Sequence, residues 1–198
     1  MSVKYYDDNA SKFKESTQDA NMEEMIQRFL FYLPKDAKIL DAGSGIGRDT
    51  KRFIELGYHV EAFDASIEMV KISSEYTGIQ TRYLTFEQLD YEDEFDGIWA
   101  CASLLHVSKD DMEEVFSRLH LALRPNGILY ASFKLRDIDF EKDGRSFTCY
   151  SESSFREFNE RIKRFEILDL NVTTDVRVGR DDEYWLNVIL RKRGELIE

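Results

Sequence analysis

The stretch from Ile39 to Asp49 combines an acidic side chain with a run of glycines, a pattern typical of a ligand-binding loop. It reads ILDAGSGIGRD, in which two apolar residues lead into Asp41 and three glycines then occupy alternate positions. Glycine accepts positive φ angles in a tight turn and leaves bare backbone that a ligand can approach. The stretch therefore predicts a bend that holds a small molecule, with a carboxylate at its mouth.

The spacing of these glycines does not fit a dinucleotide-binding loop. Such a loop reads G-x-G-x-x-G, and when Gly43 and Gly45 are placed on its first two glycines, Arg48 stands where the third belongs. Asp41 would also repel a pyrophosphate, because two anions would face each other. The loop instead favours a cofactor with positive charge, and the sulfonium and ammonium groups of S-adenosylmethionine meet that requirement.

A second acid, Asp64, ends the strand-like alternation of residues 58–64. An acid at the end of the second strand of such a sheet can accept hydrogen bonds from both hydroxyls of a ribose. The alternative is that Asp64 only caps a helix that starts at Ala65. We expect the ribose role, so that carboxylates would meet the cofactor at both its amino-acid end and its sugar.

The rest of the chain alternates between strands and helices that would position these acids. The expected helices are 22–32, 49–56, 66–76, 109–123 and 153–164, and the expected strands are 38–41, 58–64, 81–86, 95–103, 128–133, 165–173 and 184–191. Alternation of this kind indicates a parallel sheet covered by helices on both faces. No helical pattern separates the last two strands, so we expect them to form an antiparallel hairpin at a sheet edge.

With these elements in place, the sequence resembles the class I S-adenosylmethionine-dependent methyltransferases. The resemblance runs from about Tyr5 to Arg191, and its motifs are ILDAGSGIGRDT, VEAFDAS, FDGIWACASLLHV, LRPNGILYASFK and the terminal hairpin, in the order of that family. Within the family, GRDT, ACASLLHV and SFK look closest to the tellurite-resistance branch. The resemblance implies an α/β, Rossmann-like fold: a seven-stranded, mostly parallel sheet with helices on both faces and a C-terminal antiparallel hairpin.

The resemblance also implies which residues surround the cofactor. They are Asp41, Gly43, Ser44, Gly45, Arg48, Asp64, Ala65, Phe86, Glu87, Cys101 and Ala102. The family usually offers an acid to the adenine after the third strand, but Thr85 or Phe86 stands at that position here. A backbone contact from Phe86 and a side-chain contact from Glu87 are the expected substitutes. Cys101 is expected to be a small wall residue beside the methyl group rather than a nucleophile.

Methyl transfer is an in-line displacement in which the enzyme mainly aligns the acceptor and excludes water. A neutral alcohol or amine acceptor also needs a base, whereas a soft anion needs none. His106, in SLLHV just past the fourth strand, is the expected base because it lies at the active face of the sheet. The alternative is an imidazole that only hydrogen-bonds and shapes the loop. No cluster of His, Cys and Asp has the spacing of a metal site, so no metal is expected.

Basic side chains at the ligand end of the sheet are candidates for binding an anionic substrate group. Lys134 and Arg136 follow the fifth strand, and Arg145 lies in DGRSFTCY, which is expected to be an inserted loop. Each could form charge-assisted hydrogen bonds to an anion, although a single basic residue is more often a solvated charge. Tyr5 and Tyr6 are expected either to close over the cofactor or simply to pack against the core.

Composition and charge limit the classes of partner. The 198 residues carry 27 basic and 39 acidic side chains, and the net charge of −12 disfavours nucleic acid. No apolar run is long enough to span a bilayer, and the polar N-terminus lacks the apolar core of a signal peptide. Cys101 and Cys149 are expected to be reduced. These features predict a cytoplasmic protein without a membrane partner, and they leave the oligomeric state open.

We expect one domain over residues 1–198, made of an N-terminal helical arm (1–33), a cofactor-binding core (38–133) and a substrate-side region (134–198). The expected function is methyl transfer to a small-molecule acceptor, with an anionic acceptor as one option. The alternative is a catalytically inactive, S-adenosylmethionine-binding sensor or interaction module. A nicotinamide-dependent oxidoreductase is disfavoured by Asp41 and Arg48.

Overall fold

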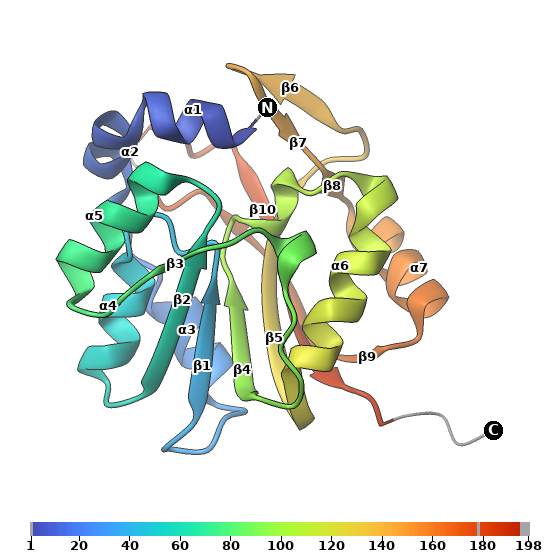
Figure 1. Ribbon diagram of the computed structural model, residues 1–198. Helices are drawn as coiled ribbons and strands as arrows, with labels where there is room; N and C mark the ends of the chain where they lie inside the picture. The colour runs from blue at the N-terminus through green and yellow to red at the C-terminus, as the bar shows by residue number, and fades with distance from the viewer. Residues whose placement is uncertain (1, 178, 195–198) are drawn as a thin grey trace.

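The computed structural model describes residues 2–177 and 179–194 of the chain. Its strands are β1 (Lys38–Ala42), β2 (His59–Asp64), β3 (Arg82–Tyr83), β4 (Phe95–Ala100), β5 (Leu123–Leu135), β6 (Phe140–Lys142), β7 (Arg145–Phe147), β8 (Cys149–Tyr150), β9 (Phe165–Thr174) and β10 (Tyr184–Lys192). All of them except β6 and β7 belong to one eight-stranded sheet. The sheet forms the centre of the molecule (Figure 1).

The helices alternate with these strands along the chain. They are α1 (Ser2–Asp8), α2 (Ala10–Thr17), α3 (Glu23–Leu30), α4 (Arg48–Glu55), α5 (Ile67–Thr77), α6 (Lys109–Ala122) and α7 (Glu152–Ile162), with short 3-10 helices η1 (Phe86–Gln88) and η2 (Leu104–His106). Within residues 2–177 and 179–194, no helix combines the length and the apolar character needed to cross a bilayer.

The strands of the central sheet do not follow one another in chain order. Seven strands follow the order β3-β2-β1-β4-β5-β10-β9, and β8 pairs with β5 outside this path. β1 to β5 and β8 pair in parallel, whereas β10 lies antiparallel to both β5 and β9. The expected α/β fold, with a mostly parallel sheet and a C-terminal antiparallel pair, is confirmed.

Apolar clusters on the two faces hold the sheet between its helices. On one face, Phe29 of α3 and Phe53 of α4 pack against Trp99 of β4, with ring centroids 5.4 Å and 5.5 Å from the Trp99 ring. On the other face, Phe116 of α6 meets Phe158 of α7 edge to face at 5.0 Å. Buried aromatic rings in such pairs contribute area and fixed geometry. They hold the strands rigidly, so the loops at the strand ends are presented in defined positions.

Three expectations about local structure are wrong. The strand expected over 81–86 is limited to β3, because Thr85 starts η1 and forms a capping box with Gln88. The strand expected over 128–133 begins earlier, because β5 also includes RPNG, where Asn126 takes a φ angle of 64°. The segment DGRSFTCY is not a loop, because it contributes β7, which pairs with β6, and β8, which extends the sheet beside β5.

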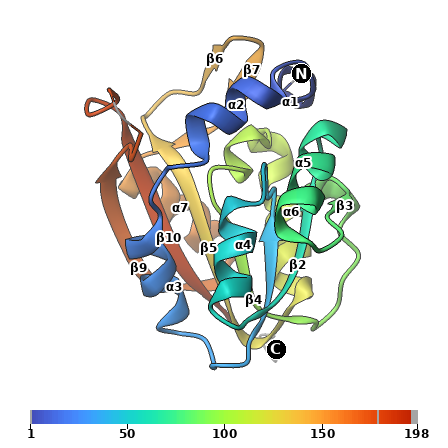
Figure 2. The same ribbon diagram turned by 90° about the vertical axis from the view of Figure 1, so that its left-hand side faces the viewer.

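Two segments lie over the carboxyl ends of the parallel strands (Figures 1 and 2). The α1–α2 segment crosses above this edge of the sheet, and the β6–β7 hairpin stands beside α1. The two segments touch where the Ser146 amide donates a hydrogen bond to Ser2 Oγ at 3.2 Å. Ligands of open α/β sheets bind at this end of the strands. Both segments are therefore placed to shape a ligand site.

Candidate functional site

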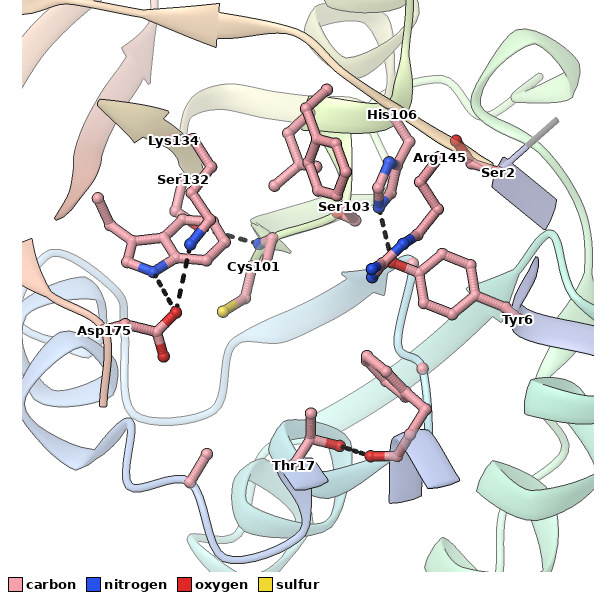
Figure 3. A pocket seen from close by; sticks show the side chains of 18 of the residues that line it. Ser2, Tyr6, Thr17, Cys101, Ser103, His106, Ser132, Lys134, Arg145 and Asp175 are labelled. Atoms are coloured by element: carbon pink, nitrogen blue, oxygen red, sulfur yellow. Dashed lines mark hydrogen bonds and ion pairs between the residues drawn. The ribbon is translucent and has the colours of Figure 1, made fainter. Parts of the chain in front are cut away.

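A large cavity opens at the carboxyl ends of β1, β4 and β5, beneath the α1–α2 segment (Figure 3). Its volume is about 1200 Å³, which exceeds the roughly 300–1,000 Å³ typical of a single small-ligand site. The wall comes from the α1–α2 segment, the loop after β1, the β6–β7 hairpin and the segment between β9 and β10. The cavity therefore has room for two ligands side by side.

The glycine bend lies at one end of this cavity. The amides of Gly43 and Ser44 both donate to the Phe63 carbonyl oxygen, at 3.0 Å and 2.9 Å, which ties the bend to β2. Gly43 has a φ angle of 78°, and a Cβ at this position would overlap the Cβ of Ser103. Only glycine satisfies both the backbone conformation and this close approach. The bend is thus fixed by its neighbours before any ligand is present.

Asp41 is buried beneath the bend, with 3% of its surface exposed. Thr50 of α4 donates its hydroxyl to Asp41 Oδ2 at 2.5 Å. Burial, and secondarily the nearby Asp49 carboxylate, raises the pKa of Asp41 to about 8. A buried carboxylate without a positive partner is costly, so this position favours a ligand that brings positive charge.

Arg48 points at protein groups rather than at open space. Its Nε and Nη2 atoms donate to the two oxygens of Asp49 at 2.8 Å and 2.9 Å, and its Nη1 donates to the Thr17 carbonyl oxygen at 3.1 Å. Asp49 Oδ2 also accepts a hydrogen bond from Trp99 Nε1 at 2.9 Å. Arg48 lines the cavity, but its hydrogen bonds connect the glycine bend to α2.

Asp49 is a site residue that the sequence analysis missed. It is buried and lines the cavity beside Asp41. In the sequence it resembles an ordinary acid in the first turn of a helix, which is usually solvated. No local signal in the sequence marks its partner Trp99, which lies 50 residues away. The one available hint was its position directly after the glycine bend.

Asp64 ends β2 and faces the bend. Its Oδ2 accepts the amide of Gly45 and its Oδ1 accepts the amide of Ser66, each at 2.8 Å. Burial raises the pKa of Asp64 to about 6, an effect that these backbone hydrogen bonds partly offset. The cap of α5 is Ser66, whose hydroxyl accepts from the Met69 amide, so Asp64 is not needed as the helix cap.

The residues at this end fit S-adenosylmethionine. The Ser44 hydroxyl is buried in the bend without a hydrogen-bond partner, and a buried hydroxyl of this kind is costly until a ligand pairs with it. Asp41 and Asp64 provide acceptors for an ammonium group and for ribose hydroxyls. Further expected cofactor residues that line the same cavity are Gly43, Gly45, Ala65, Phe86, Glu87, Cys101 and Ala102.

His106 lies at the other end of the cavity, opposite Tyr6 of α1 (Figure 3). Its Nδ1 is 2.9 Å from the Ser146 carbonyl oxygen and its Nε2 is 2.7 Å from the Tyr6 hydroxyl. A carbonyl oxygen can only accept, so Nδ1 carries the proton and Nε2 accepts from Tyr6. Burial lowers the pKa of His106 to about 4, and the imidazole is therefore neutral at physiological pH.

Cys101 and Ala102 line the cavity between its two ends. Burial raises the pKa of the Cys101 thiol well above its usual value, so the side chain remains a neutral thiol and not a nucleophilic thiolate. Ala102 takes a φ angle of 51°, and its amide donates to Ser132 Oγ at 2.8 Å. The hydrogen bond holds the backbone after β4 against β5.

The three basic residues expected to bind substrate differ in whether acidic side chains already neutralise them. Lys134 lines the cavity, but its ammonium contacts Glu183 and lies 3.3 Å from Asp175 Oδ2, so it is not a free cation in this structure (Figure 3). Arg136 lies over the Phe140 ring at 4.6 Å. Arg145 lies near the His106 end of the cavity. The sequence could not distinguish these cases, because the neutralising acids are more than 40 residues from Lys134.

The fold is the Rossmann-like fold found in S-adenosylmethionine-dependent methyltransferases. Residues 39–127 match the family model of a methyltransferase domain. This range contains the glycine bend, both cofactor acids and His106. The finer resemblance to the tellurite-resistance branch stays a prediction.

Relatives of known name agree with this class. Phosphoethanolamine N-methyltransferase 2 of Caenorhabditis elegans is 32% identical over 193 residues, which cover 90% of this chain and 41% of that protein. The chain spans about half the length of the curated relatives it matches. The rest of each relative lies outside the matched region.

Solved structures show the same fold. The 1,6-didemethyltoxoflavin-N1-methyltransferase of Burkholderia thailandensis, crystallised with 1,6-didemethyltoxoflavin and S-adenosylhomocysteine, aligns with a TM-score of 0.80 at 24% identity, covering 97% of this chain and 85% of that one. The [4+2]-cyclase SpnF aligns with a TM-score of 0.75 at 14% identity, covering 96% of this chain and 94% of that one. At these identities the likeness shows the fold alone.

Proposed function

We propose that this protein transfers a methyl group from S-adenosylmethionine to a small-molecule acceptor. The observation that carries the proposal is one cavity with two chemically different ends. Asp41, Asp64 and the unpartnered Ser44 hydroxyl line one end, and the neutral His106 imidazole lines the other. The acids suit a cationic sulfur compound, and the imidazole suits an acceptor that must lose a proton.

S-adenosylmethionine supplies a methyl group on positively charged sulfur, so the leaving group is already in place. The protein's own contribution is binding, orientation and exclusion of water. In this proposal Asp41 holds the ammonium group and Asp64 holds the ribose hydroxyls. The α1–α2 segment covers the cavity and keeps bulk water away from the acceptor.

His106 is the proposed general base for the acceptor. Its Nε2 has no proton and is directed at the Tyr6 hydroxyl, so it can take a proton from an acceptor that displaces Tyr6 or from Tyr6 acting as a relay. A soft anionic acceptor would need no such transfer. The effect of removing His106 therefore distinguishes the two kinds of acceptor.

We infer that the acceptor carries a negative charge, because cations gather at the cavity of an acidic protein. Arg136, Lys142 and Arg145 all line the cavity, while the chain as a whole has a net charge of −12. Among the described residues, Asp143 is the one carboxylate within ion-pair distance of any of these three. The Caenorhabditis elegans relative, whose name specifies a phosphate-bearing small molecule, supports the same inference.

The proposal is tested with two measurements on the full chain. Calorimetry with S-adenosylhomocysteine and with NAD should show binding of the first and none of the second. Transfer of labelled methyl groups to a panel of amines, phenols, thiols and small anions should label at least one acceptor. Binding of NAD in place of S-adenosylhomocysteine would overturn the proposal.

This fold also occurs in a [4+2]-cyclase, so a second candidate function is considered. The fold alone does not dictate methyl transfer. If S-adenosylhomocysteine binds but no acceptor in the panel is ever labelled, a binding module that acts as a sensor or interaction partner is supported instead. The tellurite-resistance branch and a cytoplasmic location remain predictions in either case.

A further inference from the structure

Arg145 has surroundings unlike those of the other cations at the cavity. Its guanidinium carbon lies 3.9 Å above the Tyr5 ring centroid, 5.3 Å from that of Phe147 and 6.0 Å from that of Tyr6. The side chain is only 15% exposed. Aromatic faces attract a guanidinium and hold its plane in one orientation. Arg145 is thus a positive charge fixed between rings from α1 and β7.

The hydrogen bonding of Arg145 is incomplete. Its Nε is buried without a partner. Its Nη2 donates a long hydrogen bond of 3.4 Å to Oδ2 of Asp143, a mostly exposed residue, and the Tyr6 hydroxyl is a further partner within reach. By contrast, Arg48 makes two short hydrogen bonds to Asp49. Leaving a buried charged donor such as Nε unpaired is costly, so a ligand oxygen that accepts from Nε would complete these surroundings.

The position of Arg145 connects it to the acceptor end of the cavity. It faces the Tyr6 hydroxyl and His106 (Figure 3), and its strand neighbour Ser146 provides the carbonyl that fixes the His106 ring. A group bound by Arg145 would therefore lie beside the proposed base. The rings of Tyr5 and Tyr6 come from α1, so this arrangement depends on the packed position of α1.

We propose that Arg145 is a preformed binding site for an oxyanion, a carboxylate or a phosphoryl group, and that Tyr5 completes the site when α1 closes. The fork of guanidinium donors matches the paired oxygens of either group. That this oxyanion belongs to the methyl acceptor rests on the proposed function. The binding of the anion does not, and it is measured without methyl transfer.

The test titrates the full chain, with and without S-adenosylhomocysteine, with inorganic phosphate and separately with acetate. Line broadening of the phosphorus signal and saturation transfer to the acetate methyl report binding. The wild-type chain should bind at least one of the two anions, and which one it prefers distinguishes a phosphoryl from a carboxylate source. Absence of binding of both overturns the proposal.

Variants identify the residue responsible. Arg145→Gln should weaken binding about tenfold or more, since a charge-assisted fork is lost, and Tyr5→Leu should weaken it about threefold or more, since the stacking face is lost. Arg156→Gln removes the same charge from the exposed surface of α7 and should leave binding unchanged. Equal binding by wild type, Arg145→Gln and Tyr5→Leu overturns the proposal, and Tyr5→Leu keeps the test valid if Arg145→Gln does not fold.

The anion site and the proposed function fail in different ways. Anion binding that depends on Arg145, without any labelled acceptor, would retain the site and reject the methyl transfer. Labelled product formed by Arg145→Gln with an unchanged acceptor KM, together with unchanged anion binding, would retain the methyl transfer and reject the site.

Discussion

Asp7 of α1 accepts a hydrogen bond from the Ser66 hydroxyl at 2.6 Å, across 59 residues of the chain. The same oxygen lies 3.4 Å from the Glu68 amide, so Asp7 sits at the N-terminus of α5, where a negative charge is favourable. The preceding residue, Tyr6, meets His106 on the acceptor side. The short helix α1 therefore contacts both α5, near the cofactor acids, and His106, on the proposed acceptor side.

Asp7→Ala should release α1 from α5 and open the cofactor end. The lost hydrogen bond to a charged group corresponds to roughly 1.5–3 kcal/mol, so S-adenosylhomocysteine should dissociate at least several-fold faster. Stopped-flow release and hydrogen exchange over residues 2–17 measure both effects. Asp8→Ala is the matched control, because Asp8 pairs only with Lys4 at the exposed surface of α1. Equal rates for the two variants would contradict the link.

Cofactor binding should release a proton from Asp41. The pKa of Asp41 is raised to about 8, so the folded, ligand-free chain retains a proton that the unfolded chain loses above about pH 4. The contribution of Asp41 to the free energy of unfolding therefore declines as pH rises from about 4 to 8. A bound ammonium group favours the ionised carboxylate, lowers its pKa and expels the proton.

The proton release is measured by calorimetry of S-adenosylhomocysteine binding at pH 7 in two buffers of different ionisation enthalpy. Affinity should rise with pH from 6.5 to 8, by at most about tenfold per unit for one proton. In Asp41→Asn this rise should disappear. A wild-type chain that binds with no net proton exchange at pH 7 would place the ammonium group away from Asp41.

His106→Asn tests the proposed base once an acceptor is labelled. Loss of a general base should lower kcat by about 10²–10⁴-fold, while the affinity for S-adenosylhomocysteine stays unchanged. Because the pKa of His106 is lowered to about 4, the imidazole is unprotonated above that pH, and wild-type activity that depends on it should fall only as pH drops toward 4. His59→Asn, at an exposed position in β2, is the control.

The outcome for His106 also identifies the acceptor chemistry. Tyr6→Phe removes the hydroxyl that meets Nε2 and retains the ring, so it should lower kcat less than His106→Asn if Tyr6 only closes the cavity. Unchanged kcat in His106→Asn would show that the acceptor reacts as an anion without a base.

Gly43→Ala should destabilise the fold more than Gly57→Ala. Both glycines have positive φ angles, 78° and 91°, but nothing lies within 4 Å of a Cβ at Gly57, whereas a Cβ at Gly43 would overlap Ser103. The left-handed conformation costs about 1–2 kcal/mol in each variant, and overpacking adds about 1–3 kcal/mol at Gly43 alone. Urea unfolding measures the difference, and equal midpoints would show that the bend is not constrained by Ser103.

Local patterns in the sequence were sufficient for the fold, and they also picked out residues that the structure brings together at one cavity. The alternation of strands and helices predicted the parallel sheet. Helices and strands each place apolar residues at their own spacing, and this spacing can be read from the sequence. The glycine bend with Asp41, and Asp64 at the end of the next strand, are local features placed at the carboxyl edge by that topology. Strand length was harder to predict from the sequence. β3 is short, and Thr85 caps the 3-10 helix η1 that follows it.

Only the tertiary structure decided which charges are free. Lys134, Arg48 and Arg145 look alike in sequence. The first is neutralised by Glu183 and Asp175 and the second by Asp49, whereas the third has one long contact with an exposed acid and a buried, unpaired Nε among aromatic rings. The partners of Lys134 and the ring of Tyr5 come from distant parts of the chain. The free energy of a buried charge depends on the neighbours that folding brings to it, and no local pattern in the sequence contains that information.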